Sequence, residues 1–169
     1  MEIWDLYDKN RILTGKTHVR GERIPEGSYH LVVHVWLRAP DGRYLMSRRA
    51  PTRKRFPMLW ECVGGAVVQG EDTYLGAVRE VYEEVGIDLH GRKGKVMYTK
   101  MRDLIEEKVF RDILDVWLFD LKEGEREDLE RATTDEVAEC LFMTKEEILA
   151  LDNEGALVPT LVEHLKKLP

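Results

Sequence analysis

The sequence predicts an α/β fold in which a mixed β-sheet lies between helices. Three observations lead to this prediction: apolar strand-like runs recur along the chain, a strongly helical stretch follows a glycine-marked loop near residue 65, and two shorter helical patterns lie near the C-terminus. A chain of 169 residues, 43% of them hydrophobic, suits one compact domain with a substantial core. Residues 1–169 are therefore expected to form a single domain.

The expected strands are apolar or alternating runs bounded by turn residues. They lie at Ile3–Tyr7, His30–Leu37, Tyr44–Ser47, Cys62–Val68, Lys95–Met101 and Val109–Leu121, and a further strand ends near Met143. The glycine pair Gly64 and Gly65 is expected to interrupt the fourth of these strands. Short helices are expected at Lys145–Leu151 and Thr160–Lys167, and the charged segment 123–131 is expected to be a solvated connector.

The principal helix is expected to run from about Thr73 to about Val85. Glu71 and Asp72 supply residue types that favour the cap and first turn, and Gly86 supplies a stop. The segment thus has the order strand, glycine-marked loop, helix.

Three carboxylates of this helix, Glu80, Glu83 and Glu84, share one face, because positions i, i+3 and i+4 lie on the same side at 3.6 residues per turn. Thr73 and Gly76 extend that face toward the start of the helix. The opposite, core-facing side is expected to carry Leu75, Val78, Val81, Tyr82 and Val85. Close like charges destabilise a helix by roughly 0.2–0.5 kcal/mol per pair. A hard divalent cation would relieve the repulsion; a solvated charged face is the plainer alternative.

The segment from Gly65 to Ile87 resembles the Nudix box, which in family notation is G(x5)E(x7)REUxEExGU, where U is aliphatic. Every fixed position matches: Gly65, Glu71, Arg79, Glu80, Val81, Glu83, Glu84, Gly86 and Ile87. The resemblance implies a Nudix α/β/α sandwich. It also implies Mg²⁺-dependent hydrolysis of a diphosphate linkage in a nucleoside diphosphate derivative or related organic pyrophosphate, with Mn²⁺ as an alternative metal.

The same resemblance implies roles for individual residues. Glu80, Glu83 and Glu84 would hold the metal and act in catalysis, with the Gly64 carbonyl as a fourth ligand. The attacking water would be oriented by one of these glutamates or by a carboxylate of a later loop. Glu136, in the Asp135–Glu136 pair, is the preferred later carboxylate, and Glu106 and Glu107 are the reserve candidates. Glu71 and Arg79 are expected to brace the loop against the helix through an ion pair.

A basic segment precedes the box. Its cations are Arg48, Arg49, Arg53, Lys54 and Arg55, and they suit either a solvated loop or diphosphate binding. The segment from Arg48 to Trp60 also resembles isopentenyl-diphosphate isomerases of the Nudix fold. That resemblance implies that Arg49 and Lys54, with Arg48 beside them, bind a substrate diphosphate and that His30 is a metal-site histidine.

The isomerase resemblance lacks the residues that its acid–base chemistry needs. Such enzymes carry a cysteine directly before the box glycine and a histidine directly after it, whereas this chain has Gly64 and Ala66. Cys62 lies two residues too early. Arg23 stands where a further histidine is expected, and His18 is the nearest substitute. An isomerase-like enzyme and a non-catalytic nucleotide- or metabolite-binding domain remain as alternatives, and His30 is then expected to be structural or substrate-facing.

Composition limits the remaining classes. A net charge of −6 disfavours a broad surface for nucleic-acid polymers, and no apolar run is long enough for a membrane span. Residues 1–11 do not resemble a signal peptide, so a cytoplasmic location is the default and Cys62 and Cys140 are expected to be free thiols. The expected partner is a small-molecule diphosphate, and a homodimer is expected by analogy alone. Aromatic residues suited either to core packing or to stacking on a base are Trp4, Tyr29, Phe56, Trp60 and Tyr98.

Overall fold

A seven-stranded mixed sheet forms the centre of the computed structural model, which describes residues 1–105, 108–133 and 135–169, without the side chains of residues 104–109. Its main path has the order β5-β4-β3-β8-β7, with β6 also paired to β3 and β9 to β4. The strands are β3 His30–Arg38, β4 Tyr44–Arg49, β5 Trp60–Glu61, β6 Val63–Ala66, β7 Lys95–Ile105, β8 Lys108–Asp120 and β9 Val137–Met143. The β3–β8 pair is parallel and the others are antiparallel.

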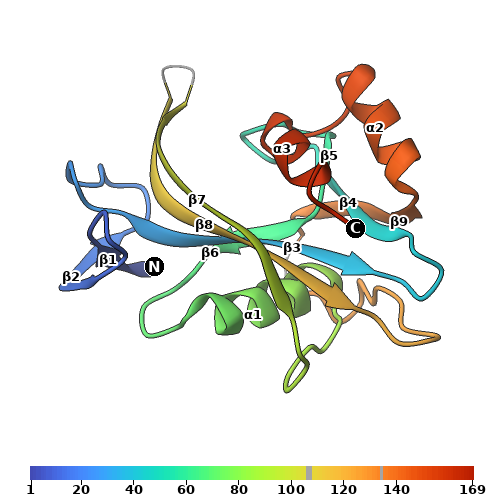
Figure 1. The fold of residues 1–169 in the computed structure, drawn as a ribbon, viewed down its shortest axis with the longest axis horizontal. Helices are drawn as coiled ribbons and strands as arrows, with labels where there is room; N and C mark the ends of the chain where they lie inside the picture. Colours follow the sequence, from blue (N-terminus) through green and yellow to red (C-terminus); the bar gives the residue numbers. More distant parts are fainter. Residues whose placement is uncertain (106–107, 134) are drawn as a thin grey trace.

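Helices cover both faces of this sheet, as predicted. Helix α1 (Thr73–Val85) lies on one face, and α2 (Lys145–Asn153) and α3 (Val162–Leu165) lie on the other (Figure 1). Because neighbouring side chains of a strand point to opposite faces, β3 supplies Val33 and Val35 to the core beneath α1 and Trp36 to the core beneath α3. The α/β/α sandwich is thereby confirmed.

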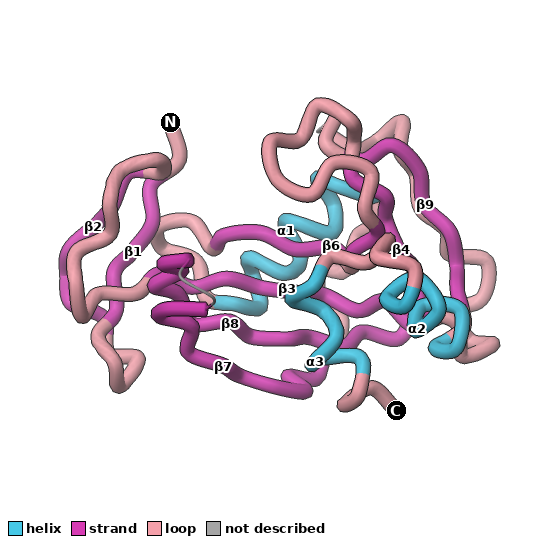
Figure 2. The backbone as a smooth tube through the Cα atoms, turned by 90° about the horizontal axis from the view of Figure 1, so that it is seen from above, coloured by secondary structure: helices cyan, strands magenta, loops and turns pink. Residues whose placement is uncertain are grey.

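An antiparallel hairpin precedes the main sheet. It is formed by β1 (Ile3–Tyr7) and β2 (Leu13–Val19) and lies beside one end of the sheet (Figure 2). A backbone bridge between Tyr7 and Tyr29 joins it to the start of β3. The sequence did not predict β2, because its first five residues are exposed and lack apolar alternation.

Two further local predictions were wrong. The glycine pair does not interrupt its strand: β6 runs through Gly64 and Gly65, whose backbone pairs with His34 and Val33 of β3. The C-terminal helix is shorter than expected, because residues Pro159–Leu161 form a 3-10 turn before α3. The segment 123–131 contains no helix or strand, as expected of a connector.

Helix α1 begins and ends where its capping residues predict. The Asp72 side chain accepts a hydrogen bond from the Leu75 amide at 2.9 Å, which satisfies one free N–H at the start. Gly86 ends the helix with a φ of 73°. A Cβ at Gly86 would lie 2.1 Å from the Asp128 carbonyl oxygen, so both the backbone conformation and the neighbouring loop require glycine.

The predicted division of α1 into a core face and an exposed carboxylate face was wrong. Val78, Val81 and Val85 are in the core, but Leu75 and Tyr82 are 43% and 41% exposed. Glu84 is instead only 6% exposed. At 100° per residue, Glu84 falls between the buried residues Thr73 and Ala77 on the helix surface, so it belongs to the arc that faces the protein. Glu84 is therefore buried in the fold, whereas the Glu83 side chain remains 39% exposed.

Candidate active site

Arg79 connects the carboxylates of α1 to the loop that precedes the helix. Its guanidinium donates to Glu71 at 2.9 Å, to Glu80 at 2.8 Å and to Glu83 at 3.2 Å. It also donates to the Ala66 carbonyl at 2.9 Å, at the end of β6. The ion pair expected between Glu71 and Arg79 is present. One side chain thus fixes strand, loop and helix relative to one another.

Glu80 and Glu84 are carboxylates held in a poorly solvated position. Burial raises the pKa of Glu80 to about 7, although Arg79 opposes the shift. Burial raises the pKa of Glu84 well above its ordinary value, and the neighbouring carboxylates of Glu61 and Glu80 add to the shift. Within the described residues, Oε2 of Glu84 is buried without a hydrogen-bond partner. A buried carboxylate oxygen without a partner calls for compensation by a proton or a cation.

The absence of a side chain at Gly65 allows Glu80 to occupy this position. A Cβ at Gly65 would lie 2.3 Å from the Glu80 carboxyl carbon. At the preceding residue, Gly64, a Cβ would lie 2.6 Å from the carbonyl oxygen of Val33. Gly64 is thus required by the neighbouring backbone, whereas a side chain at Gly65 would displace the Glu80 carboxylate; the metal-ligand role of the Gly64 carbonyl stays a prediction.

The structure adds Glu61 to the residues expected at this site. Glu61 is on β5, and burial raises its pKa even though its carboxylate accepts hydrogen bonds from Arg49 at 2.6 and 2.7 Å. Glu61 and Glu136 both raise the pKa of Glu84 electrostatically, so the four carboxylates of Glu61, Glu80, Glu84 and Glu136 form one charged neighbourhood. The sequence offered one weak indication of this role: Glu61 is a charged residue between the apolar residues Trp60 and Cys62.

The basic segment is tied to carboxylates through three of its arginines. Arg49 pairs with Glu61, Arg53 with Glu136, and Arg48 with Glu139 at 2.7 Å. Lys54 and Arg55 are exposed. The segment is therefore neither a wholly solvated loop nor a free cluster of cations. The diphosphate-binding roles of Arg48, Arg49 and Lys54 stay predictions.

The structure describes two of the four candidates for the later-loop carboxylate, Glu136 and Asp135. Glu136 directly precedes β9 and belongs to the charged neighbourhood through Arg53 and Glu84. Asp135 is exposed in the same loop. The reserve candidates Glu106 and Glu107 lie outside the described residues.

The carboxylates are not assembled as a preformed metal cage. Among the described residues, no group of three or more histidine, cysteine, aspartate or glutamate side chains could hold a metal ion. The Arg79 guanidinium donates to one oxygen of Glu80 and one of Glu83. The donor set nevertheless fits Mg²⁺, because it consists of oxygens and includes the unpartnered oxygen of Glu84.

The two histidines considered for a metal site both lie beside Trp4. Its indole stacks on His30 with ring centroids 4.1 Å apart and lies 5.8 Å from His18. Burial and the positive charge of Arg102 lower the pKa of His30 to about 4. The His18 ring contacts the carbonyl oxygen of Glu22 at 3.2 Å. This arrangement favours a structural role for His30, one of the two roles expected from the sequence.

The buried His30 predicts a specific pH dependence of stability. Its pKa is about 4 in the folded protein and about 6.5 in the unfolded chain, so its contribution is complete above pH 6.5 and is lost as the pH falls toward 4. Relative to His30→Gln, the wild type should lose about 2–3 kcal/mol of unfolding free energy between pH 7 and pH 4. Urea unfolding of both proteins at several pH values measures the difference. A gap independent of pH would contradict the buried neutral histidine.

Cys62 and Cys140 are free thiols, as expected, and Cys62 is buried. Burial and the neighbouring carboxylates of Glu61 and Glu84 raise the pKa of the Cys62 thiol well above its ordinary value. Cys62 is thus held as an unreactive thiol in the core beneath α3.

Comparisons with known proteins identify the family and the fold. The NUDIX domain family model matches residues 28–163. An uncharacterized Nudix hydrolase of Listeria monocytogenes is 38% identical over 162 residues, covering 94% of this chain and 89% of the relative. An isopentenyl-diphosphate Delta-isomerase of Streptomyces coelicolor is 29% identical over 101 residues, covering 57% of this chain and 51% of the isomerase.

A solved structure shows the same fold over nearly the whole chain. The crystal structure of DR0079 from Deinococcus radiodurans matches with a TM-score of 0.76 at 20% identity and covers 99% of both chains. No described helix is both long and apolar enough to cross a membrane. With its complete box, its family match and its sandwich fold, the chain belongs to the Nudix hydrolase family, whose members act on pyrophosphate bonds.

Proposed function

We propose that this protein is a Mg²⁺-dependent Nudix diphosphohydrolase that cleaves a diphosphate linkage in a nucleoside diphosphate derivative or related organic pyrophosphate. The observation that carries the proposal is the carboxylate of Glu84, which is buried with one unpartnered oxygen and is influenced electrostatically by Glu61, Glu80 and Glu136. Carboxylates buried together are unfavourable unless a cation or a proton compensates them. A cation that also binds phosphate oxygens would turn this arrangement into a catalytic site.

Each group has a role in the proposed reaction. Glu80, Glu83 and Glu84 would hold the metal, which neutralises phosphate charge and acidifies a water when bound. Glu136 would orient the attacking water, since it directly precedes β9 and lies in the same charged neighbourhood as Glu84. Arg48, Arg49 and Lys54 would bind the diphosphate, because guanidinium groups match pairs of phosphate oxygens. Glu61 would hold the Arg49 guanidinium at the site through their ion pair.

We propose that metal binding involves a local exchange of partners. Arg79 would release one oxygen each of Glu80 and Glu83 to the metal while keeping its contacts with Glu71 and the Ala66 carbonyl. The guanidinium thus acts as a substitute counterion in the metal-free protein. Mn²⁺, which also favours oxygen ligands, is the alternative metal.

The experiment is a product analysis with purified protein. Nucleoside di- and triphosphates, nucleotide sugars, dinucleotides and isopentenyl diphosphate are incubated with Mg²⁺, with Mn²⁺ and with EDTA. Release of phosphate, pyrophosphate or a nucleoside monophosphate, abolished by EDTA, is the expected result. A protein that binds these compounds but turns none of them over would instead be a binding domain.

Isomerase activity is the second candidate, because of the partial similarity to an isopentenyl-diphosphate isomerase. Its signature in the same assay is conversion to dimethylallyl diphosphate without phosphate release. The burial of the Cys62 thiol and its raised pKa favour the hydrolase.

Cys62→Ala separates these two candidates. The substitution should leave hydrolysis within about twofold of wild type, because a buried, protonated thiol supplies no thiolate nucleophile. It should lower the unfolding free energy by about 1 kcal/mol through lost core packing. Steady-state kinetics and urea unfolding measure the two effects. Loss of activity in a variant that remains folded would favour cysteine-dependent isomerase chemistry.

A further inference from the structure

The β1–β2 hairpin is bound to the segment that carries the box. The backbone N–H of Gln69 donates to the carbonyl oxygen of Ile3 at 2.8 Å, and the N–H of Gly70 donates to the Asp5 carboxylate at 2.8 Å. Both acceptors are on β1, and both donors are in the loop that leads into α1. The hairpin therefore holds the box loop by its backbone.

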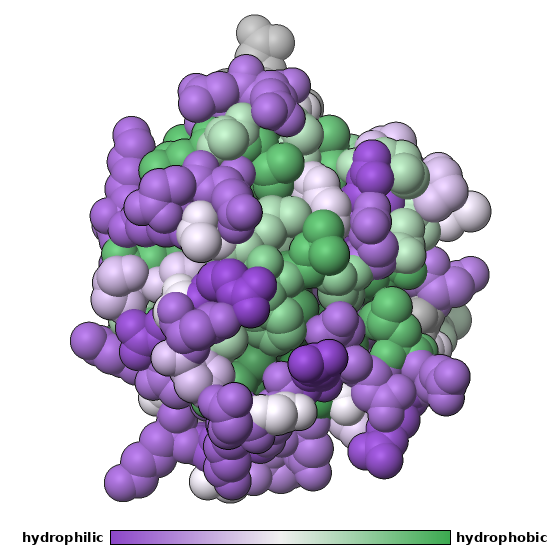
Figure 3. All heavy atoms as spheres, turned by 90° about the vertical axis from the view of Figure 1, so that its right-hand side faces the viewer, coloured by the Kyte–Doolittle hydropathy of each residue, from purple (hydrophilic) through white to green (hydrophobic). Residues whose placement is uncertain are grey.

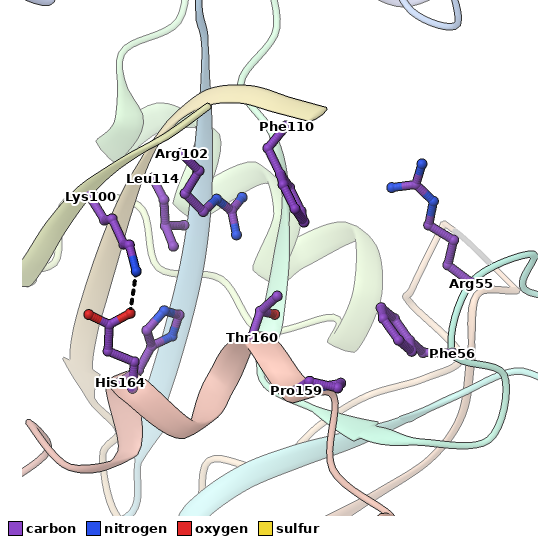
Figure 4. A pocket seen from close by; sticks show the side chains of 10 residues that line it. Arg55, Phe56, Lys100, Arg102, Phe110, Leu114, Pro159, Thr160 and His164 are labelled. Carbon is purple, nitrogen blue, oxygen red and sulfur yellow. Dashed lines mark hydrogen bonds and ion pairs between the residues drawn. The ribbon is translucent and has the colours of Figure 1, made fainter. Parts of the chain in front are cut away.

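Other prominent features of the surface lie away from the box. A cavity of about 580 Å³ opens on the sheet face opposite α1, and its described lining residues are all outside the box (Figure 4). The flank that bears α2 and the C-terminus, where apolar side chains gather near the centre (Figure 3), is at the end of the molecule far from the hairpin (Figure 1). Unlike the cavity, the hairpin contacts the box segment, and it does so at a second point as well.

The second point is the carboxylate of Asp115 on β8, which is only 2% exposed. One of its oxygens accepts a hydrogen bond from the hydroxyl of Thr73, the first residue of α1, at 2.7 Å. The other accepts from the hydroxyl of Thr99 on β7, also at 2.7 Å. Arg11, in the turn of the hairpin, donates to both oxygens through its two terminal nitrogens. One buried carboxylate thus joins the hairpin, α1 and β7.

The hairpin turn holds Arg11 in a defined position. The Asp8 carboxylate accepts hydrogen bonds from the N–H groups of Asn10 and Ile12 at 2.8 and 2.9 Å. The Asp8 carbonyl accepts from the Arg11 N–H at 3.0 Å. Arg11 has a φ of 61°, and such a left-handed conformation in a residue other than glycine persists only where surrounding contacts impose it. The guanidinium is therefore fixed by the turn as well as by Asp115.

Asp115 is held in its ionised form. Burial acts to raise the pKa of this carboxyl, but the hydrogen bonds from Arg11, Thr99 and Thr73 outweigh it and lower the pKa below its ordinary value. An ionised carboxylate only accepts hydrogen bonds, so the Thr73 hydroxyl is the donor. Hydrogen bonds to a charged group are roughly twice as strong as those between neutral groups. Arg11 therefore strengthens the contact that holds the start of α1.

Thr73 lies on the same side of α1 as two of the box glutamates. At about 100° per residue, Glu80 and Glu84 are only about 20° to either side of Thr73 around the helix axis. A rotation of the helix that moves Thr73 away from Asp115 would therefore turn both carboxylates as well. Misplacement of a reacting group by about 1 Å can lower a rate about 10²-fold. The hydrogen bond at the start of α1 thus determines the direction of carboxylates further along it.

We propose that Asp115 is a positioning residue for the proposed hydrolysis: it fixes the rotation of α1 through Thr73 and is itself fixed by the hairpin through Arg11. The inference rests on the proposed function, in which Glu80 and Glu84 hold the metal. The hairpin then affects the reaction through the box loop and the start of α1. Its removal from Asp115 should impair alignment of the metal ligands in a protein that keeps its fold.

The test compares two threonines that donate to the same carboxylate. Thr73→Val and Thr99→Val each replace a hydroxyl by a methyl group and remove one 2.7 Å hydrogen bond to Asp115, but only Thr73 belongs to α1. Thr73→Val should lower kcat about tenfold, because loss of a supporting contact commonly costs about 10–100-fold in activity or metal affinity. KM should change little, since the basic segment proposed to bind the diphosphate is outside α1. Thr99→Val should change neither quantity appreciably.

Mg²⁺ binding gives a readout that does not depend on turnover. Calorimetric titration of substrate-free protein should show Mg²⁺ binding about tenfold weaker in Thr73→Val than in wild type, and unchanged in Thr99→Val. Thr73→Ser retains the hydroxyl and should recover most of the lost kcat and Mg²⁺ affinity. Equal effects of the two valine substitutions on kcat and on Mg²⁺ affinity would overturn the inference.

Arg11→Gln tests the contribution of the hairpin. It should reproduce the fall in kcat and in Mg²⁺ affinity seen with Thr73→Val, again about tenfold. Arg92→Gln is its control, because Arg92 also donates through both terminal nitrogens to one carboxylate, that of Glu125, and does so outside the hairpin. Arg92→Gln should leave kcat and Mg²⁺ affinity unchanged. Equal losses in the two arginine variants would show a general effect of stability and contradict the role of the hairpin.

Metal binding and turnover distinguish this inference from the proposed function. Mg²⁺ binding that is weakened by Thr73→Val and Arg11→Gln, in a protein that hydrolyses none of the diphosphates, would support the positioning role and contradict the diphosphohydrolase. Hydrolysis that is equally fast in wild type, Thr73→Val and Arg11→Gln would support the hydrolase and overturn the positioning role.

Discussion

Glu84→Gln is expected to lower kcat by about 10²–10³-fold at saturating Mg²⁺ while the protein remains folded. The expected loss corresponds to about 3–4 kcal/mol of transition-state stabilisation, a reasonable share of what a bound metal supplies. This prediction rests on the unpartnered buried oxygen of Glu84. Glutamine is neutral and therefore cannot replace it as an anionic ligand. Steady-state kinetics across a Mg²⁺ titration give kcat and the apparent metal affinity.

The same variant should be at least as stable as the wild type when no metal is present. The raised pKa of Glu84 means that the folded protein retains a proton that the unfolded chain releases near pH 4.3. Stability therefore falls as the pH rises above that value, because ionisation in the fold is unfavourable. Glutamine does not ionise, so the stability of the variant relative to wild type should increase from pH 5 to pH 8.

Glu146→Gln is the matched control, since Glu146 is exposed on α2. It should change neither kcat nor the pH dependence of stability. Wild-type turnover in a folded Glu84→Gln protein would remove Glu84 from the proposed site. A large fall in its stability would instead show that the carboxylate has a structural partner.

Arg79→Gln should lower the unfolding free energy of the metal-free protein by about 2–3 kcal/mol. Removing one partner of a buried ion pair commonly costs about 3–5 kcal/mol, and a lower value is expected here because the Glu83 side chain is 39% exposed. The variant leaves Glu71, Glu80 and Glu83 without their shared cation. Urea unfolding with EDTA measures the loss.

Mg²⁺ should restore part of this stability, because the metal replaces the missing positive charge beside Glu80 and Glu83. The comparison is Arg43→Gln, which removes an exposed pair with Asp41 and should leave stability nearly unchanged, with no response to Mg²⁺. Equal effects of the two substitutions would contradict the central role of Arg79. A Mg²⁺ response confined to Arg79→Gln would support partner exchange between guanidinium and metal.

The local pattern of the sequence was sufficient to place the principal helix. Asp72 and Gly86 determine its ends through side-chain and backbone hydrogen bonds with residues of the helix itself. Strands β3 and β8 were also predictable, because their apolar runs are long enough to be buried on both faces. Interactions between residues close together in the chain produce residue patterns that can be recognised in a single sequence.

The sequence was insufficient where a side chain depends on distant segments. Glu61 looks like one acidic residue in a short apolar strand, and only the packing of β5 near α1 and the basic segment brings it to Glu84 and Arg49. Phe110 likewise becomes part of a cavity only because β8 and the β4–β5 loop meet the C-terminal segment.

The sequence by itself determined the family, the principal helix and the identity of the three box glutamates, because these depend on residue types at fixed spacings. Only the tertiary structure decided that Glu84 is buried and that Arg79 holds Glu80 and Glu83. Only the tertiary structure brought Glu61 into the charged neighbourhood. The physical reason is that burial and electrostatic coupling arise between segments far apart in the chain, whose approach is fixed by the packing of the whole sheet.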